Sequence, residues 1–166
     1  MSTRGYMGIK KKGELKGQYN HFDSYIEGLG KEIIDTLNTI PKKDLISKLN
    51  EVYDNIILVN EDDKPTKELI DYALKNNLYD SYVSSRSTND LYCLLRNAQG
   101  RLDLYLGGLK YMLNGNEFLK DKLFCEYGYI INLDESTLDI YINGVLDYQA
   151  DLLDLDYNKI AEYFEN

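Results

Sequence analysis

The sequence predicts a single α+β domain over residues 1–166, with an antiparallel sheet built from N- and C-terminal hairpins and helices between them. Segments with strand-like alternation lie near both ends of the chain, and amphipathic helical segments fill the middle. The length of 166 residues and the hydrophobic content of 43% suit one sizeable core. Because a hairpin is antiparallel by construction, α+β is favoured over a doubly wound α/β sheet.

The first predicted elements are two strands, 3–9 and 14–20, joined by the turn sequence KKKG. Gly13 closes this turn and can adopt the positive φ that a tight hairpin needs. The pattern therefore predicts a β-hairpin at the start of the domain.

Two amphipathic helices are predicted next, within residues 28–40 and 41–55. Their apolar residues recur at the spacing of one helical face, and Pro41 stands where a helix tolerates proline best. The apolar positions are Leu29, Ile33, Ile34 and Leu37 in the first helix and Leu45, Leu49, Val52 and Tyr53 in the second. Residues 56–60 then predict a short buried strand.

Residues 64–77 predict a third helix, which begins at Pro65 or Thr66. The polar segment 84–90 predicts a loop in which Ser87 or Thr88 caps the following helix. The segment 101–113 fits a helix or a strand, and we favour a helix.

The last third returns to strands at 124–133 and 137–143, separated by the turn-forming sequence DES. Alternation in the second strand predicts a buried face with Leu138 and Ile140 and a solvent-exposed face with Asp139 and Tyr141. A final helix is predicted over 157–164.

The composition indicates a cytosolic protein. No stretch approaches the roughly 20 apolar residues of a membrane span, and a lysine run occupies the place of a signal peptide's apolar segment. Cys93 and Cys125 are far apart in the sequence and fit reduced, buried thiols better than a disulfide framework. The chain holds 16 tyrosines and no tryptophan, a usage typical of AT-rich genomes such as those of low-GC bacteria and their phages.

The net charge of −9 is unevenly distributed. Residues 1–18 hold five basic residues and one acidic residue, whereas residues 126–166 hold ten acidic residues and one lysine. Phosphate backbones repel an acidic surface, so direct nucleic-acid binding is disfavoured and a basic protein partner is favoured. The simpler alternative is that the charge only maintains solubility.

No metal or cofactor is predicted. One histidine and two separated cysteines do not compose a usual zinc site, and the acidic run 60–64 lacks the ligand spacing of a calcium loop. Gly28 and Gly30 precede a helix and suggest phosphate binding. The alternative, which we favour, is that these glycines let the chain turn sharply into the helix.

His21 is the only histidine, and two interpretations of its surroundings stay open. In extended structure Asp23 would point to the same side as His21, and with Arg4 they would form the centre of a small hydrolase or transferase. Ser24 would point to the opposite face, so a linear triad is poor geometry. We favour a structural role, in which His21 and Asp23 hydrogen-bond the backbone of a strand-to-helix turn and Asp23 pairs with Arg4.

A further catalytic hypothesis concerns the N-terminus. If Met1 were removed, the amine of Ser2 could activate its own hydroxyl as a nucleophile. Retention of Met1 would block that chemistry.

A candidate protein-binding surface lies on the C-terminal strands, where tyrosines stand beside acidic residues. Tyrosine is enriched at the centres of protein interfaces, although it is also an ordinary strand residue. The candidate binding residues are Glu126, Tyr127, Tyr129, Asp139 and Tyr141.

The N-terminal segments TRGYMGIKKKG, YNHFDSY and GLG resemble a family of small phage and bacterial proteins. The matching residues are Thr3, Arg4, Gly5, Gly8, the run 19–25 and Gly28–Gly30. Residues 126–143 are similar in style to the family's strand pair. Ile26 departs from the family pattern, which has proline there. The resemblance implies a shared fold and no particular activity.

Together these observations favour a non-enzymatic phage or mobile-element accessory protein that binds a host protein with a basic nucleic-acid-binding surface. Inhibition of a host defence system such as CRISPR is one form of that hypothesis. The alternative is the hydrolase or transferase centred on Arg4, His21 and Asp23. A third hypothesis is a ligand-sequestering protein that uses the helix start at Gly28–Gly30.

Overall fold

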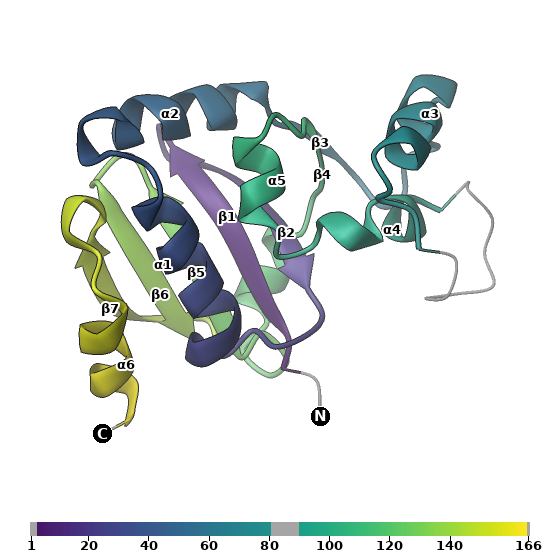
Figure 1. Cartoon of the computed structure of the whole chain (residues 1–166). Coiled ribbons are helices and arrows are strands. Elements are labelled where there is room, and N and C mark those ends of the chain that lie inside the picture. The colour runs from purple at the N-terminus through teal and green to yellow at the C-terminus, as the bar shows by residue number, and fades with distance from the viewer. Residues whose placement is uncertain (1–2, 81–89, 166) are drawn as a thin grey trace.

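The computed structural model describes residues 3–80 and 90–165 and confirms the α+β class. A five-stranded sheet has the order β2-β1-β5-β6-β7, and helices cover one of its faces (Figure 1). The strands are β1 (Gly5–Lys11), β2 (Glu14–Asn20), β5 (Tyr127–Asn132), β6 (Thr137–Ile142) and β7 (Val145–Asp151). β1 and β5 are parallel, and the other pairs are antiparallel. The two ends of the chain therefore meet inside one sheet, as the sequence predicts.

The α-helices are α1 (Lys31–Asn38), α2 (Lys42–Asn55), α3 (Lys67–Lys75), α4 (Leu91–Leu94), α5 (Leu102–Leu106) and α6 (Tyr157–Glu165). A π-helical turn, η1 (Ile26–Gly30), leads into α1, and three 3₁₀ turns complete the description: η2 (Arg96–Ala98), η3 (Asn116–Lys120) and η4 (Leu152–Asp154). A short parallel pair, β3 (Ile57–Val59) with β4 (Tyr111–Leu113), stands apart from the main sheet.

The N-terminal hairpin forms as predicted. Lys12 and Gly13 have φ values of 51° and 76°, the left-handed conformation of a two-residue hairpin turn. The Asp134 carboxylate accepts hydrogen bonds from the backbone N–H groups of Lys12 (2.7 Å) and Gly13 (2.9 Å). A side chain from the β5–β6 turn thereby fixes the β1–β2 turn.

The main core fills the space between the sheet and the helices. The eight apolar residues predicted for the two helical faces are all buried, and they pack against Met7, Ile9, Tyr129 and Ile131 of the sheet. Lys16 on β2 donates to the carbonyls of Tyr53 (2.9 Å) and Ile56 (2.8 Å) at the end of α2. The end of α2 is thus tied to the edge of the sheet.

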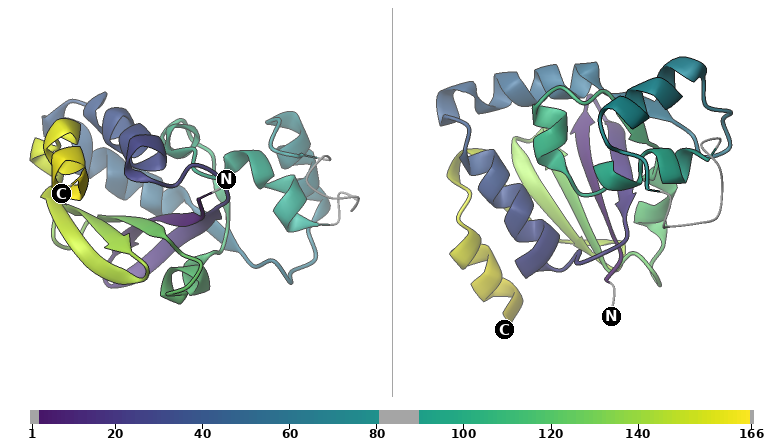
Figure 2. Two further views of the ribbon diagram at one scale, coloured as in Figure 1. Left: turned by 90° about the horizontal axis from the view of Figure 1, so that it is seen from below. Right: turned by 45° about the vertical axis from the view of Figure 1, so that its right-hand side comes forward.

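The other face of the sheet carries a small second cluster that packs under η3. The η3 segment lies on the opposite side of the sheet from α1 and α2 (Figure 2). Tyr6 lies across two glycines of neighbouring strands: a Cβ at Gly8 would come within 2.7 Å of its hydroxyl oxygen, and one at Gly17 within 1.9 Å. The Tyr6 hydroxyl donates to Asn116 Oδ1 (2.7 Å).

Two segments differ from the prediction. Residues 101–113 contain a helix and then a strand, because Gly107 and Gly108 end α5 before β4 begins. The segment 56–60 does form a strand, but Ile57 is 47% exposed, because β3 pairs with β4 rather than entering the main sheet.

The C-terminal hairpin extends into a third strand, β7, that the sequence analysis missed. Asn143 and Gly144 form the second left-handed turn, with φ values of 50° and 80°. The β6–β7 register shifts between Ile140 and Tyr141, so Asp147 is an extra residue in the edge strand. Such a bulge distorts an edge and discourages pairing with another chain.

The caps of α3 and α4 explain where these helices begin. The Thr66 side chain accepts a hydrogen bond from Leu69 N, as predicted for the start of the third helix. Asp90 caps α4 by accepting from Tyr92 N (2.9 Å). Ser87 and Thr88, the predicted caps, lie outside the described residues.

Both cysteines are buried and neither forms a disulfide, as predicted. Within the described residues, no helix is long and apolar enough to cross a membrane.

Candidate functional site

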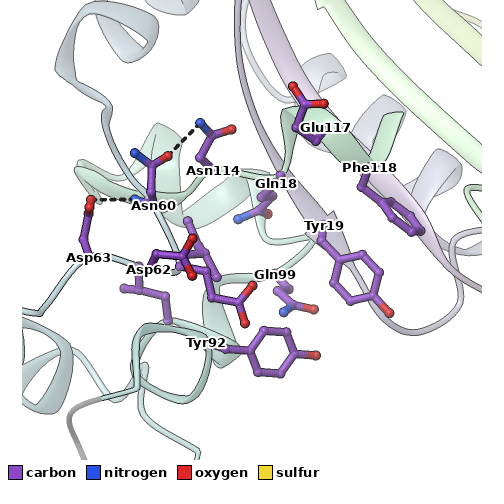
Figure 3. A pocket seen from close by; sticks show the side chains of 14 residues that line it. Gln18, Tyr19, Asn60, Asp62, Asp63, Tyr92, Gln99, Asn114, Glu117 and Phe118 are labelled. Atoms are coloured by element: carbon purple, nitrogen blue, oxygen red, sulfur yellow. Dashed lines mark hydrogen bonds between the residues drawn. The ribbon is translucent and has the colours of Figure 1, made fainter. Parts of the chain in front are cut away.

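A cavity of about 660 Å³ lies where the β3–β4 pair and α4 meet the β2 edge of the sheet (Figure 3). We call it the β2-edge pocket. Its described lining consists of Gln18, Tyr19, residues 60–63, Tyr92, Leu95, Gln99, residues 113–115, Glu117 and Phe118. Segments far apart in the sequence therefore build one hollow.

One side of the pocket is acidic. Residues 60–63 form a turn after β3, in which Asp63 Oδ2 accepts a hydrogen bond from Asn60 N (3.0 Å). No hydrogen bond or ion pair joins the exposed side chains of Glu61 and Asp62 to another residue in the described part of the chain. Figure 3 shows Asp62 projecting toward the middle of the pocket, whereas Asp63 turns back to its own loop. Two unpaired carboxylates are thus available on this side.

Glu117 adds a third available carboxylate at the rim. Lys120 Nζ lies 3.7 Å from its Oε1, but both side chains are largely exposed, so water screens that attraction strongly. No lysine, arginine or histidine is among the described lining residues. The formal charge of the described lining is therefore negative.

The opposite side of the pocket is aromatic. Phe118 meets the Tyr19 ring edge-on, with centroids 4.8 Å apart and an interplanar angle of 87°. The Tyr92 ring lies 6.4 Å from that of Tyr19, tilted by 41°. Figure 3 shows Tyr19 and Tyr92 side by side, across the pocket from Asp62. These three rings form an aromatic wall.

The polar groups of Gln18 and Gly115 in the floor of the pocket are hydrogen-bonded. Gln18 is 2% exposed; its Nε2 donates to Tyr105 Oη (3.3 Å) and its Oε1 accepts from Gly100 N (2.8 Å). Gly115 N donates to Gly17 O (2.9 Å), which ties the segment after β4 to β2. A Cβ at Gly115 would lie 2.4 Å from Tyr19 N, so only glycine allows this approach.

His21 lies next to the aromatic wall and contacts the Tyr19 side chain. The Tyr19 hydroxyl and His21 Nδ1 form a hydrogen bond (2.6 Å), and Gln99 Oε1 accepts from His21 N (3.1 Å). Burial lowers the pKa of His21, and the guanidinium charges of Arg96 and Arg4 lower it further. Burial raises the pKa of Tyr19. At neutral pH the imidazole is therefore uncharged and the phenol is protonated, in keeping with this hydrogen bond.

The structure does not bring His21 and Asp23 together as a dyad. β2 ends at Asn20, and Asp23 has a φ of 50°, so the i, i+2 geometry of an extended strand is lost. The Asp23 carboxylate instead lies beside Tyr25 and raises the pKa of that phenol. The Arg4 guanidinium lies over Phe124, with its central carbon 5.7 Å from the ring centroid.

The turn itself is held by residues other than those we predicted. Asn20 Nδ2 donates to Phe22 O (2.7 Å) and Ser24 Oγ (2.9 Å), and Ser24 is fully buried. Asn20 and Ser24 thus satisfy the corner that the sequence analysis assigned to His21 and Asp23. Ser2, the candidate terminal nucleophile, lies outside the described residues.

The predicted binding surface on the C-terminal strands is not one exposed face. Tyr129 is 0% exposed and Asp139 is 4% exposed. Glu126 is exposed, but Tyr127 and Tyr141 are half-buried and point to opposite faces of the sheet. The expectation of a solvated strand face is wrong at Tyr129 and Asp139.

The unpredicted strand β7 explains the burial of Asp139. It places Gln149 opposite Asp139, and Gln149 Nε2 donates to Oδ1 (3.1 Å). Thr137 Oγ1 donates to Oδ1 (2.6 Å) and Asn132 Nδ2 to Oδ2 (3.0 Å). Three neutral donors therefore hold this carboxylate inside the sheet.

The glycines before α1 are explained by packing. A Cβ at Gly28 would lie 2.2 Å from Asp23 O, and one at Gly30 would lie 3.0 Å from the Tyr129 hydroxyl. Close approach of the chain thus accounts for the motif without a phosphate. Among the described residues, no group of three His, Cys, Asp or Glu side chains could hold a metal ion.

The β2-edge pocket could not be predicted from the sequence. The acidic run 60–64 was visible but looked like an ordinary solvated turn, and the three rings come from separate segments. Only the topology brings Tyr19, Tyr92 and Phe118 together. No family model, curated protein or solved structure matches this chain.

Proposed function

We propose that this protein acts without catalysis, by binding a basic segment of another protein in the β2-edge pocket. The observation that carries the proposal is the pairing of a sizeable cavity with the unpaired carboxylates of Glu61 and Asp62, with no cation in the described lining. Burying a positive side chain there gives those carboxylates the partner they lack.

The charge of the whole molecule supports this proposal. A net charge of −9 attracts basic surfaces over several ångströms and accelerates their encounter, especially at low salt. The same charge repels nucleic acid directly. The partner class is therefore a protein whose surface is itself basic, such as one that binds nucleic acid.

A role in a phage or mobile element belongs to the same proposal. A host protein with a nucleic-acid-binding surface, including a component of a defence system, offers the basic segment that the pocket requires. Occupation of that surface would inhibit the host protein in the cytosol by excluding its nucleic acid.

Catalysis by Arg4, His21 and Asp23 has less support. The imidazole forms a hydrogen bond with the Tyr19 hydroxyl, and Asp23 lies beside Tyr25 instead. His21 therefore has a neighbouring phenol but no carboxylate to orient it as a base.

The proposal is tested by charge reversal with a matched control. Fluorescence anisotropy measures the binding of a labelled peptide of alternating arginine, lysine and glycine to the parent, to Glu61→Lys/Asp62→Lys and to Glu135→Lys/Asp154→Lys. All four residues are exposed, but only the first pair lines the pocket. Both double variants change the net charge equally.

We expect the pocket variant to weaken binding about tenfold or more, since each exposed charge contributes up to about 1 kcal/mol. The control should weaken it less than about threefold. Equal losses in the two variants would mean that the peptide senses only the overall charge, and the proposal would be wrong.

A further inference from the structure

The β2-edge pocket has a second property that its carboxylates do not explain. Acidic side chains attract any cation, but Tyr19, Tyr92 and Phe118 form an apolar wall facing them. If the acidic turn at residues 60–63 were only a solvated loop, it would not need aromatic rings opposite it. These rings therefore restrict the kind of cation that fits.

We propose that the pocket recognises the guanidinium group of an arginine side chain in preference to the ammonium group of lysine. This inference rests on the proposed function, because it names the chemical group that the acidic pocket receives. The occupant is a basic peptide segment of a partner protein with at least one accessible arginine.

The geometry of the two sides favours a flat cation. A guanidinium is planar and weakly hydrated, so one face can stack on an aromatic ring while its edge donates hydrogen bonds to carboxylates. Tyr19 and Tyr92 supply rings on one side, and Asp62 supplies a carboxylate from the other. An ammonium ion pairs with the carboxylate equally well but loses more hydration against the rings.

The neighbouring segment of this chain already uses that stacking. The Arg96 guanidinium carbon lies 5.1 Å from the Phe22 ring centroid, and Nη1 donates to Gln99 Oε1 (3.3 Å). Gln99 also lines the β2-edge pocket. An arginine from a partner would stack on the rings of the pocket in the way that Arg96 stacks on Phe22.

The wall is held in position, as selectivity requires. Tyr19 is fixed by its hydrogen bond to His21 and by edge-on contact with Phe118. Tyr92 is placed at the start of α4, whose first turn is capped by Asp90. The rings can therefore receive a ligand without first being ordered.

The experiment compares three peptides that differ at one central position, which holds arginine, lysine or citrulline in an otherwise Gly/Ser background. Citrulline keeps the planar shape of arginine but carries no charge. Isothermal titration calorimetry measures each peptide against the parent, Tyr92→Leu, Tyr92→Phe, Phe118→Leu and Glu61→Lys/Asp62→Lys. Circular dichroism melting curves identify any variant that is not folded.

For the parent we expect arginine to bind about tenfold more tightly than lysine, because the planar guanidinium stacks on a ring with a smaller loss of hydration than an ammonium group. Citrulline should bind most weakly. Tyr92→Leu should bring the arginine-to-lysine ratio close to one, whereas Tyr92→Phe should keep it because the ring remains. Phe118→Leu, on a different element, should also lower the ratio by loosening Tyr19.

Failure of this inference differs from failure of the proposed function. If arginine and lysine bind the parent equally, and only the charge-reversal variant weakens them, then the acidic pocket is real and the arginine preference is refuted. If Tyr92→Leu weakens both peptides by the same factor, the rings support the fold and do not select. If neither cationic peptide binds the parent more tightly than citrulline, the proposed function fails as well.

Discussion

Tyr6 shows how single residues set the shape of the sheet. The hydroxyl end of its ring lies against Gly8 and Gly17, and its hydroxyl donates to Asn116 on η3. Glycine leaves the room that the ring occupies, and the ring in turn covers backbone that glycine would leave bare. The sequence contains these residues, but it does not reveal that the Tyr6 ring packs against the two glycines.

Gly17→Ala should destabilise the protein by about 1–3 kcal/mol, the usual cost of overpacking a core. The added Cβ would fall 1.9 Å from the Tyr6 hydroxyl oxygen, so the ring must move. Gly107→Ala is the matched control, because its Cβ would meet only backbone oxygens at 3.4 Å. Urea unfolding of both variants measures the difference, and similar stabilities would contradict this packing.

Asp134 is a second residue whose effect can be measured, here through pH. Hydrogen bonds from the N–H groups of Gly13 and Lys12 lower the pKa of Asp134. Its folded pKa lies below its unfolded pKa of about 3.9, so its stabilisation is complete above about pH 4 and is lost as the pH falls through the folded pKa.

Asp134→Asn should therefore lower the urea midpoint at pH 7, and its difference from the parent should shrink as the pH is lowered from 5 to 2. Glu135→Gln, at the exposed neighbouring position, controls for the loss of one surface charge. A difference between parent and Asp134→Asn that stays constant over this pH range would rule out the linkage.

At the scale of elements, Tyr129 joins the central strand β5 to the turn before η1. Its hydroxyl donates to Ser24 O (2.7 Å), and both residues are fully buried. Burial raises the pKa of Tyr129, so this hydroxyl stays protonated and the bond persists through the alkaline range where an exposed tyrosine ionises. Tyr129, which was predicted to bind a partner, instead links β5 to the turn before η1 inside the core.

Tyr129→Phe should lower the free energy of unfolding by about 1–2 kcal/mol, since it leaves a buried carbonyl without its donor. Tyr148→Phe keeps the ring that packs against Tyr163, with centroids 4.7 Å apart, and should change stability by less than about 0.5 kcal/mol. Thermal or urea unfolding of the two variants provides the comparison. Equal effects would show that the Tyr129 hydroxyl does not anchor η1.

The elements that could be predicted are those specified by local pattern. The first hairpin, the apolar faces of α1 and α2, and the β5–β6 pair follow from spacing and turn residues alone. β7 was missed although Asn143–Gly144 is a strong hairpin signal, because only Tyr148 and Ala150 of its side chains are even partly buried and alternation is weak. Without β7, the buried position of Asp139 could not be foreseen.

At the scale of the whole molecule, the candidate site does not lie where the sequence concentrates its acidic residues. The C-terminal third holds the most acidic residues, but its strands bury Asp139, and the half-buried tyrosines of these strands lie on both faces. The pocket instead combines the turn at 60–63 with rings from β2, α4 and η3. These segments meet through tertiary contacts, so no local pattern could predict the site.

The central claim is that the β2-edge pocket, and not the C-terminal strand face, receives a basic segment. A titration of ¹⁵N-labelled protein with the arginine-containing peptide, followed by two-dimensional NMR, tests it most directly. We expect saturable shifts in the backbone amides of Gln18, Tyr19, residues 60–63, Tyr92 and residues 114–118. Shifts confined to residues 126–151, or no saturable shifts at all, would contradict the claim.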